Sequence, residues 1–196
     1  MSREKRRTVI ARAAEELFAA HGYAEASMDA IAKRAGVTAP VIYQHFGSKA
    51  GLHLALLEER GPAILVAVAE RVAATDGAEA RLRAGIDAFF AFVRAHPATW
   101  RLLFRDAPAD PAVAEVARRQ QAQTTTAIAA LLRADAGRWL ERDPDPEEAT
   151  EIVAELLKSG LNGLAGWWWD HPDVPRERIV GVVMDAVFTG LERLRG

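Results

Sequence analysis

Apolar residues recur along this chain at intervals of three and four residues, which is the spacing of one face of an α-helix. Near the start, one such stripe comprises Ile10, Ala13, Ala14, Leu17 and Phe18, and a second comprises Met28, Ile31, Ala32 and Ala35. No segment alternates apolar and polar residues with the period of two that a half-buried β-strand shows. The chain is therefore predicted to be all-α.

Start and stop signals divide the first 47 residues into three short helices. Gly22 is expected to end the first helix by adopting a left-handed conformation after its last turn. Ser27 is expected to cap the second helix and Gly36 to end it. Thr38 caps the third helix, where Pro40 is tolerated because first-turn amides have no intrahelical acceptor. We expect a three-helix domain over residues 1–47.

The remaining residues, 48–196, are expected to form a larger helical domain, which brings the total to about nine helices. Predicted loops occupy 105–111 and 141–149, and a bend is expected near Gly61 and Pro62 in the first helix of this domain. The predicted helices are 48–75, 77–96, 97–104, about 112–140, about 147–169 and about 176–194.

Composition narrows the class of protein. The chain has 196 residues, half of them apolar, and no cysteine, which excludes disulfide scaffolds and thiolate metal sites. It shows neither a signal peptide nor an uncharged apolar run of about 18 residues, so we expect a soluble cytoplasmic protein. Residues 1–50 carry eight basic and five acidic side chains, a net +3, which leaves −5 for the rest. The two parts are therefore expected to meet different partners.

The third short helix is the most informative segment. On a helix of 100° per residue, Ile42 and Phe46 share one face, and the neighbouring residues cover the other faces. A helix of barely two turns needs the rest of the domain to hold it. Two short helices joined through Gly36-Val37-Thr38 match the helix-turn-helix, whose second helix enters the DNA major groove.

Residues 10–52 resemble the tetracycline-repressor (TetR) family of bacterial regulators. The positions that carry the resemblance are Leu17-Phe18, His21-Gly22-Tyr23, Ile31-Ala32, Ala35-Gly36-Val37, Tyr43, Phe46 and Ser48-Lys49. The resemblance implies a homodimer that binds double-stranded operator DNA with its first domain and a small-molecule effector with its helical body. It also implies pairing through the last two helices, and repression that ends when the effector releases the DNA.

The resemblance assigns roles by position. Residues matching Ala39, Pro40 and Val41 face base edges, those matching Tyr43, Gln44 and His45 contact phosphates and some bases, and the one matching Lys49 pairs with a phosphate. Ser27 and Thr38 lie at helix N-termini and are further phosphate candidates. Gln44 is expected to provide the hydrogen-bonded base readout, and Ala39 and Val41 contacts to thymine methyl groups. Alternatively, Tyr43 and His45 only pack or cap.

The N-terminal basic residues are expected to form an arm along the DNA backbone or in the minor groove. They are Arg3, Lys5, Arg6 and Arg7.

Aromatic and polar side chains of the body are candidates for an effector pocket. They are Phe89, Phe92, Trp100, Phe104, Gln121, Thr124 and Trp168. Each aromatic residue is at least as compatible with plain core packing. The aromatic-rich body is expected to suit an apolar or cationic aromatic effector. Gly160, Gly163 and Gly166 lower helix stability, so we expect another backbone to approach them closely.

Two other classes of protein, an enzyme and a small-molecule carrier, fit the sequence less well. An all-helical enzyme is disfavoured because the histidines are scattered, and Asp170, His171 and Asp173 fit a helix-ending turn better than an acid–base cluster. We expect no cofactor and no metal. An all-helical small-molecule carrier or binding module without DNA recognition would keep the body, but it would not need an exposed third helix.

Overall fold

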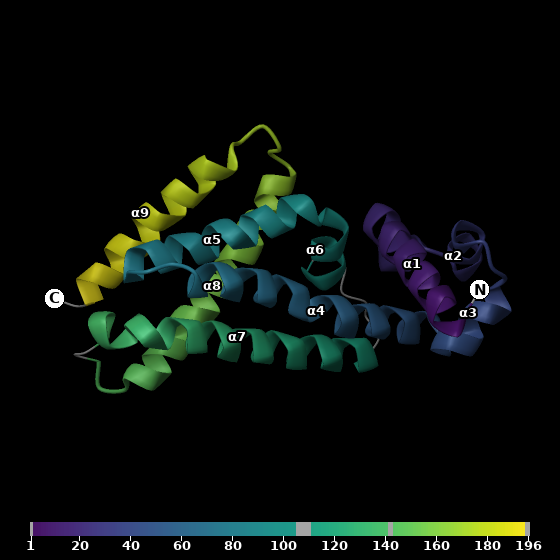
Figure 1. Cartoon of the computed structure of the whole chain (residues 1–196), viewed down its shortest axis with the longest axis horizontal. Coiled ribbons are helices and arrows are strands. Elements are labelled where there is room, and N and C mark those ends of the chain that lie inside the picture. The colour runs from purple at the N-terminus through teal and green to yellow at the C-terminus, as the bar shows by residue number, and fades with distance from the viewer. Residues whose placement is uncertain (1, 105–110, 141–142, 195–196) are drawn as a thin grey trace. The chain divides into compact units, whose positions relative to one another are not determined.

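The computed structural model of the protein describes residues 2–104, 111–140 and 143–194. These ranges contain nine α-helices and no strand, which confirms the predicted fold class (Figure 1). The helices are α1 (Arg3–Glu25), α2 (Met28–Ala35), α3 (Ala39–Phe46), α4 (Lys49–Ala73), α5 (Ala78–Ala95), α6 (Pro97–Phe104), α7 (Pro111–Trp139), α8 (Pro146–Trp169) and α9 (Arg176–Leu194). Most of the loop predicted at 105–111 lies outside the described residues.

The chain divides into two compact units. The first, here called the N-terminal unit, comprises Met1–Pro62 and His96–Gln120, and the second, the C-terminal unit, comprises Ala63–Ala95 and Gln121–Gly196. Helix α4 continues through Pro62 and so runs from the first unit into the second. Helix α6 belongs to the same unit as residues 1–62. The domain boundary predicted between residues 47 and 48 stays a prediction.

The N-terminal unit has one apolar core. Its largest fully buried side chains come from six helices and include Ile10, Phe18, Ile31, Ile42, Leu52, Leu56, Leu102 and Val113. Burying a side chain of this size stabilises the fold by about 1.5–3 kcal/mol. Both apolar stripes predicted for the first two helices face this core, although Leu17 is only half-buried.

A polar junction fixes α1 within this unit. The carboxylate of Glu15 accepts a hydrogen bond from the hydroxyl of Thr99 on α6 and another from Nε of Arg60 on α4 at 3.2 Å. The Glu15 side chain is largely buried, so these two donors supply the partners that a desolvated carboxylate needs. Helix α6 and helix α4 are thereby both tied to α1.

Helix ends follow the predicted signals with two differences, at Gly22 and at Thr38, whose hydroxyl makes no capping hydrogen bond to α3. Ser27 accepts a hydrogen bond from the amide of Ala30 at 3.1 Å, and Gly36 adopts the left-handed conformation that ends α2. Gly22 has φ +78° and ψ 165°, which breaks the helical backbone inside α1, and the element resumes as far as Glu25. The prediction that Gly22 interrupts the first helix is therefore confirmed, but α1 ends three residues later, at Glu25.

In the C-terminal unit, α5 packs against α8 and α9 (Figure 1). Phe90 meets the ring of Trp168 edge to face at 5.7 Å, and the indole Nε1 of Trp168 donates to the carbonyl of Val174 at 2.8 Å. Arg176 at the start of α9 pairs with Asp87 of α5 at 3.0 Å. Among the described residues, no helix has the length and apolar character needed to cross a membrane.

Candidate nucleic-acid interface

The turn between α2 and α3 is built from backbone geometry that the sequence signals. Gly36 has φ +67° and ψ 32°, a conformation that other residues rarely adopt. The amide of Val37 donates to the carbonyl of Ala32 at 3.0 Å, which closes the end of α2. The next residue, Thr38, is extended and begins α3. Two short helices are thus held in the arrangement of a helix-turn-helix.

Helix α3 has one anchored face and one face in solvent. Ile42 is 0% exposed, and Phe46 packs against the same core. Pro40 and Gln44 lie on the opposite face, Tyr43 lies on the side of the helix beside them, and all three are exposed. Because α3 is only eight residues long, these three side chains form nearly its whole outer surface.

The other predicted contact residues of α3 are less accessible. Ala39, Val41 and His45 are half-buried, and Ala39 and Val41 pack against the core of the N-terminal unit. The hydroxyl of Thr38 is exposed and makes no capping hydrogen bond, whereas that of Ser27 is engaged as the cap of α2. The predicted DNA contacts of these five residues stay predictions.

A glycine that the sequence analysis did not single out lets α4 begin directly beside the end of α3. A Cβ atom at Gly51 would lie 2.1 Å from the carbonyl oxygen of Phe46. Gly47 has φ +75°, and the hydroxyl of Ser48 accepts a hydrogen bond from the amide of Gly51 at 2.9 Å. A glycine inside the first turn of a helix, two residues after the Ser48-Lys49 pair, was the available signal for this close approach.

Lys49, the predicted phosphate ligand, also has partners within the protein. Its Nζ donates to the carbonyl of Ala24 at 3.1 Å and lies 4.6 Å from the centre of the Tyr23 ring. Partial burial lowers the pKa of Lys49. The side chain therefore ties the start of α4 to the end of α1.

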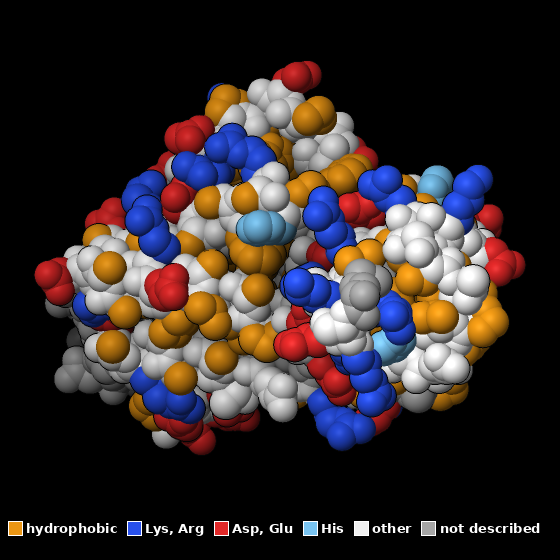
Figure 2. Space-filling model, turned by 45° about the vertical axis from the view of Figure 1, so that its right-hand side comes forward, with side chains coloured by type: hydrophobic (Ala, Val, Ile, Leu, Met, Phe, Trp, Pro, Cys, Tyr) orange, Lys and Arg blue, Asp and Glu red, His pale blue; other side chains and the backbone are white. Residues whose placement is uncertain are grey.

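The residues expected to form an N-terminal arm are helical instead. Ser2 caps α1, which begins at Arg3, so the four basic residues occupy its first turns. The guanidinium of Arg7 lies 4.7 Å from the centre of the Phe46 ring, which places this cation beside the end of α3. Lys and Arg side chains gather around the N-terminal helices that face the viewer in Figure 2.

Two basic side chains of the N-terminal unit, Arg12 of α1 and Arg34 of α2, are paired with one carboxylate. Nε of Arg34 donates to Glu16 at 2.8 Å, and the same carboxylate receives Nε of Arg12 at 3.2 Å. The hydrogen bonds from Arg34 and Arg12 lower the pKa of Glu16. Because Arg34 and Arg12 share this carboxylate, their local positive potential is lower than that of unpaired cations.

Behind α3, an unpaired histidine sits in the core. His53 of α4 is 1% exposed, and neither ring nitrogen has a hydrogen-bond partner. Phe18 and Tyr23 meet its ring edge to face at 5.4 and 5.1 Å. Burial lowers the pKa of His53 to about 4, so the ring is neutral at physiological pH.

The predicted effector-pocket residues fall on both compact units. Phe89, Phe92 and Trp168 are buried in the C-terminal unit, where Gln121 and Thr124 are half-buried on α7. The other two predicted residues, Trp100 and Phe104, belong to the N-terminal unit. The indole N–H of Trp168 is already used by a backbone carbonyl, which is typical of a packed core residue. The pocket stays a prediction.

Helices α8 and α9 carry exposed apolar side chains. Ile152, Leu156 and Trp167 of α8 and Val182 of α9 are between 45% and 67% exposed. Residues 152, 156, 163 and 167 lie on one helical face. A Cβ atom at Gly160 or Gly163 would meet nothing within 4 Å, so the close partner expected for these glycines is not within the described part of this chain.

Comparison with known proteins identifies the family to which the chain is similar. A family model described as "Bacterial regulatory proteins, tetR family" matches residues 10–62, and one described as "Tetracyclin repressor-like, C-terminal domain" matches residues 78–190. The chain is 38% identical over 195 residues to the HTH-type transcriptional activator FasR of Mycolicibacterium smegmatis, covering 99% of this chain and 86% of the relative.

Two solved structures share the fold at lower identity. The regulator FadR from Bacillus subtilis in complex with stearoyl-CoA has a TM-score of 0.75 and 16% identity, covering 96% of this chain and 97% of that one. AibR in complex with isovaleryl coenzyme A and operator DNA has a TM-score of 0.72 and 20% identity, covering 93% of this chain and 98% of that one.

Proposed function

Because the chain belongs to the tetR family of bacterial regulatory proteins and is a DNA-binding transcriptional regulator, we propose that it acts as a ligand-responsive homodimer. Each protomer would place α3 in the major groove of an operator. Two such helices would enter successive grooves about 34–36 Å apart on a roughly palindromic site. This family is not an enzyme class.

The observation that carries this proposal is the outer face of α3. Pro40, Tyr43 and Gln44 are exposed on a helix whose opposite face is fixed by Ile42 and Phe46. A small-molecule carrier would gain nothing from ordering these side chains in solvent. Gln44 suits bidentate contact with adenine, and the Tyr43 hydroxyl suits a phosphate.

The partner proposed for α8 and α9 is a second copy of the chain. The exposed face with Leu156 and Trp167 on α8 and Val182 on α9 is apolar, and the open glycines Gly160 and Gly163 leave room for a close backbone. Two such helices and their symmetry mates would form a four-helix interface. Such an interface would remove these side chains from water.

The proposed effector is an acyl-CoA or a related acyl compound. Two proteins with the same fold were solved with stearoyl-CoA and isovaleryl coenzyme A bound. The C-terminal unit of this chain supplies apolar side chains that suit an acyl group, including Phe89 and Phe92. Binding would act on α4, which runs from beside α3 into this unit, and Pro62 is the proposed pivot. By linkage, DNA and effector would weaken each other equally, typically by about 1–3 kcal/mol.

The sign of control depends on the position of the operator relative to the promoter. Repression is what the resemblance implies, and the relative at 38% identity is named as an activator. Release from DNA by an effector can produce either outcome. We propose a repressor, and a reporter assay with the operator in its native position decides between the two signs.

The proposal is tested by fluorescence anisotropy with DNA from upstream of the gene. We expect tight binding to one site, weaker binding to random DNA, and release on addition of an acyl-CoA. Equal affinity for all DNA sequences, or no DNA binding at all, would contradict the proposal that the protein regulates transcription at an operator. It would leave the helical carrier as the alternative.

A further inference from the structure

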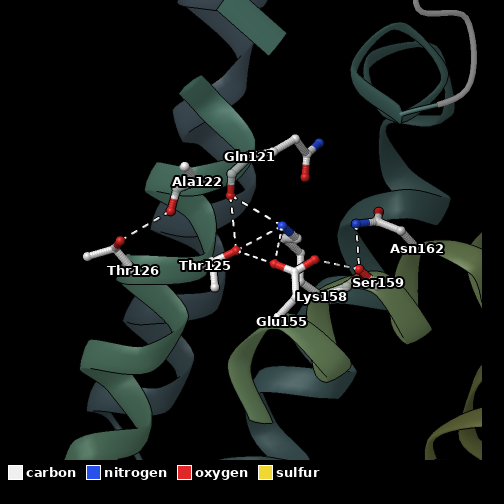
Figure 3. Close-up of polar contacts among 8 residues, drawn as sticks. All are labelled: Gln121, Ala122, Thr125, Thr126, Glu155, Lys158, Ser159 and Asn162. Carbon is white, nitrogen blue, oxygen red and sulfur yellow. Dashed lines mark hydrogen bonds and ion pairs between the residues drawn. The ribbon is translucent and has the colours of Figure 1, made fainter. Parts of the chain in front are cut away.

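A nearly buried ammonium group lies between α7 and α8 in the C-terminal unit (Figure 3). Lys158 is 9% exposed. Its Nζ donates to the hydroxyl of Thr125 at 2.8 Å and to the carbonyl of Gln121 at 3.4 Å, and it pairs with the carboxylate of Glu155 at 2.6 Å. These acceptors match the three N–H groups of a lysine.

The two members of the ion pair are unequally buried. The Glu155 side chain is 52% exposed, and its carboxylate also accepts hydrogen bonds from Thr125 at 2.7 Å and Ser159 at 2.8 Å. Hydrogen bonds from Lys158, Thr125 and Ser159 lower the pKa of Glu155 to about 2, so it is ionised at neutral pH. Three donors from two helices therefore converge on one anion.

Because Lys158 is buried and Glu155 is half exposed, the carboxylate of Glu155 is the member of the pair that another anion can replace. A buried ammonium group is costly without a counter-charge, so Lys158 needs an anion beside it. The carboxylate of Glu155 is already half in water, so it can turn outward, and an incoming anion that accepts from the same three donors offsets the interactions that Glu155 gives up. Glu155 and Lys158 are three residues apart on the same helix, so their pairing does not join α7 to α8. The hydrogen bonds from Lys158 to Thr125 and Gln121 join the two helices and remain when Glu155 leaves, whereas the hydrogen bond from Thr125 to Glu155 is replaced by one to the incoming anion.

We propose that Lys158, Thr125 and Ser159 form a binding site for an anionic group of the effector, which displaces the carboxylate of Glu155. The inference rests on the proposed function, in which the helical body binds a small molecule. The chemical class is a carboxylate or a phosphate, because either accepts hydrogen bonds from the same three donors. Two sources are available: the carboxylate of a fatty acid and the phosphates of a coenzyme A ester.

The test measures thermal unfolding of the full chain with octanoate, octanoyl-CoA or octanol. We expect at least one of the two anions to raise the melting temperature of the wild type more than octanol does. Lys158→Met should abolish that difference. Arg133→Met is the matched control, because Arg133 pairs with Glu147 between the same two helices but is 40% exposed. It should respond like the wild type.

Glu155→Gln provides a second arm that does not depend on the folding of the lysine variant. Removing the competing carboxylate should tighten binding of the same anion by about tenfold, in line with the strength of a charged hydrogen bond. The anion whose effect depends on Lys158 identifies the source.

Several results would overturn the site: no shift with either anion, an equal shift with octanol, an unchanged response in Lys158→Met, an equal loss in Arg133→Met, or no tightening in Glu155→Gln. DNA binding without ligand is measured separately on the wild type. Specific DNA binding combined with any of these results contradicts the anion site and leaves the regulator intact. If the wild type shows no specific DNA binding, the proposed function itself is contradicted.

Discussion

Replacing His53 with phenylalanine should flatten the dependence of stability on pH in the mildly acidic range. The imidazole is buried among Phe18 and Tyr23 with both nitrogens unpaired. The folded protein therefore accommodates the neutral ring and disfavours the imidazolium ion. Phenylalanine keeps the ring contacts and cannot bind a proton.

The magnitude follows from the two pKa values of His53, 6.5 in the unfolded chain and about 4 in the folded protein. Because the folded pKa is depressed, the unfolded chain binds the proton first as the pH falls. The stabilisation is present above pH 6.5 and is lost progressively as the pH falls toward 4. Between about pH 7 and about pH 5 the expected loss is about 2 kcal/mol. The lowered pKa values of Glu16 and Glu155 act at lower pH, below their usual 4.5.

The assay is urea unfolding followed by circular dichroism at the two pH values. For the wild type, a loss of about 2 kcal/mol lowers the unfolding midpoint by about 1 M urea. His53→Phe should lose much less, and His21→Gln, which alters an exposed histidine of the same unit, should behave like the wild type. Any constant packing cost of the phenylalanine cancels in this comparison. If His53→Phe and the wild type lost the same stability, the argument that burial keeps His53 neutral would be refuted.

Three further predictions concern the interface and the assembly. Lys49→Ala should weaken binding to operator and random DNA alike, reduce the slope of log K against log salt by about 1 per phosphate contact, and lower the free energy of unfolding. Gln44→Ala should mainly reduce the preference for the operator over random DNA in competition binding. The reverse pattern would exchange the roles assigned to the two residues. Gly51→Ala should destabilise the N-terminal unit by at least about 2 kcal/mol in urea unfolding, because its Cβ would lie 2.1 Å from a backbone oxygen, and a neutral result would contradict that geometry. Leu156→Glu should give monomers by light scattering, while Val66→Glu, exposed on α4, should stay dimeric; a dimer in both would place the interface elsewhere.

Much of the N-terminal unit was predictable because its signals are local. The caps at Ser27 and Gly36 and the buried stripe of α2 depend on residues within one or two turns, and the structure confirms them. The anchoring of α3 by Ile42 and Phe46 followed from helical periodicity alone. The boundaries of α9 also match the prediction, because Pro175 marks the start of this helix.

Contacts between distant residues could not be predicted. Nothing in the local sequence pairs Glu15 with Thr99, although that contact ties α6 to α1. The burial of Lys158 depends on α7 crossing α8, which periodicity does not reveal. The basic N-terminal residues were expected to form an arm, but helix propagation from the Ser2 cap orders them.

Hydroxyl-radical footprinting of the upstream DNA tests the central claim most directly, namely that the outer face of α3 reads a duplex twice per assembly. The wild type should protect two segments one helical turn, about 34–36 Å, apart. The double variant Tyr43→Ala, Gln44→Ala should lose both segments while keeping the same helical content by circular dichroism. Unchanged protection in the double variant, or a single protected segment with the wild type, would contradict the account.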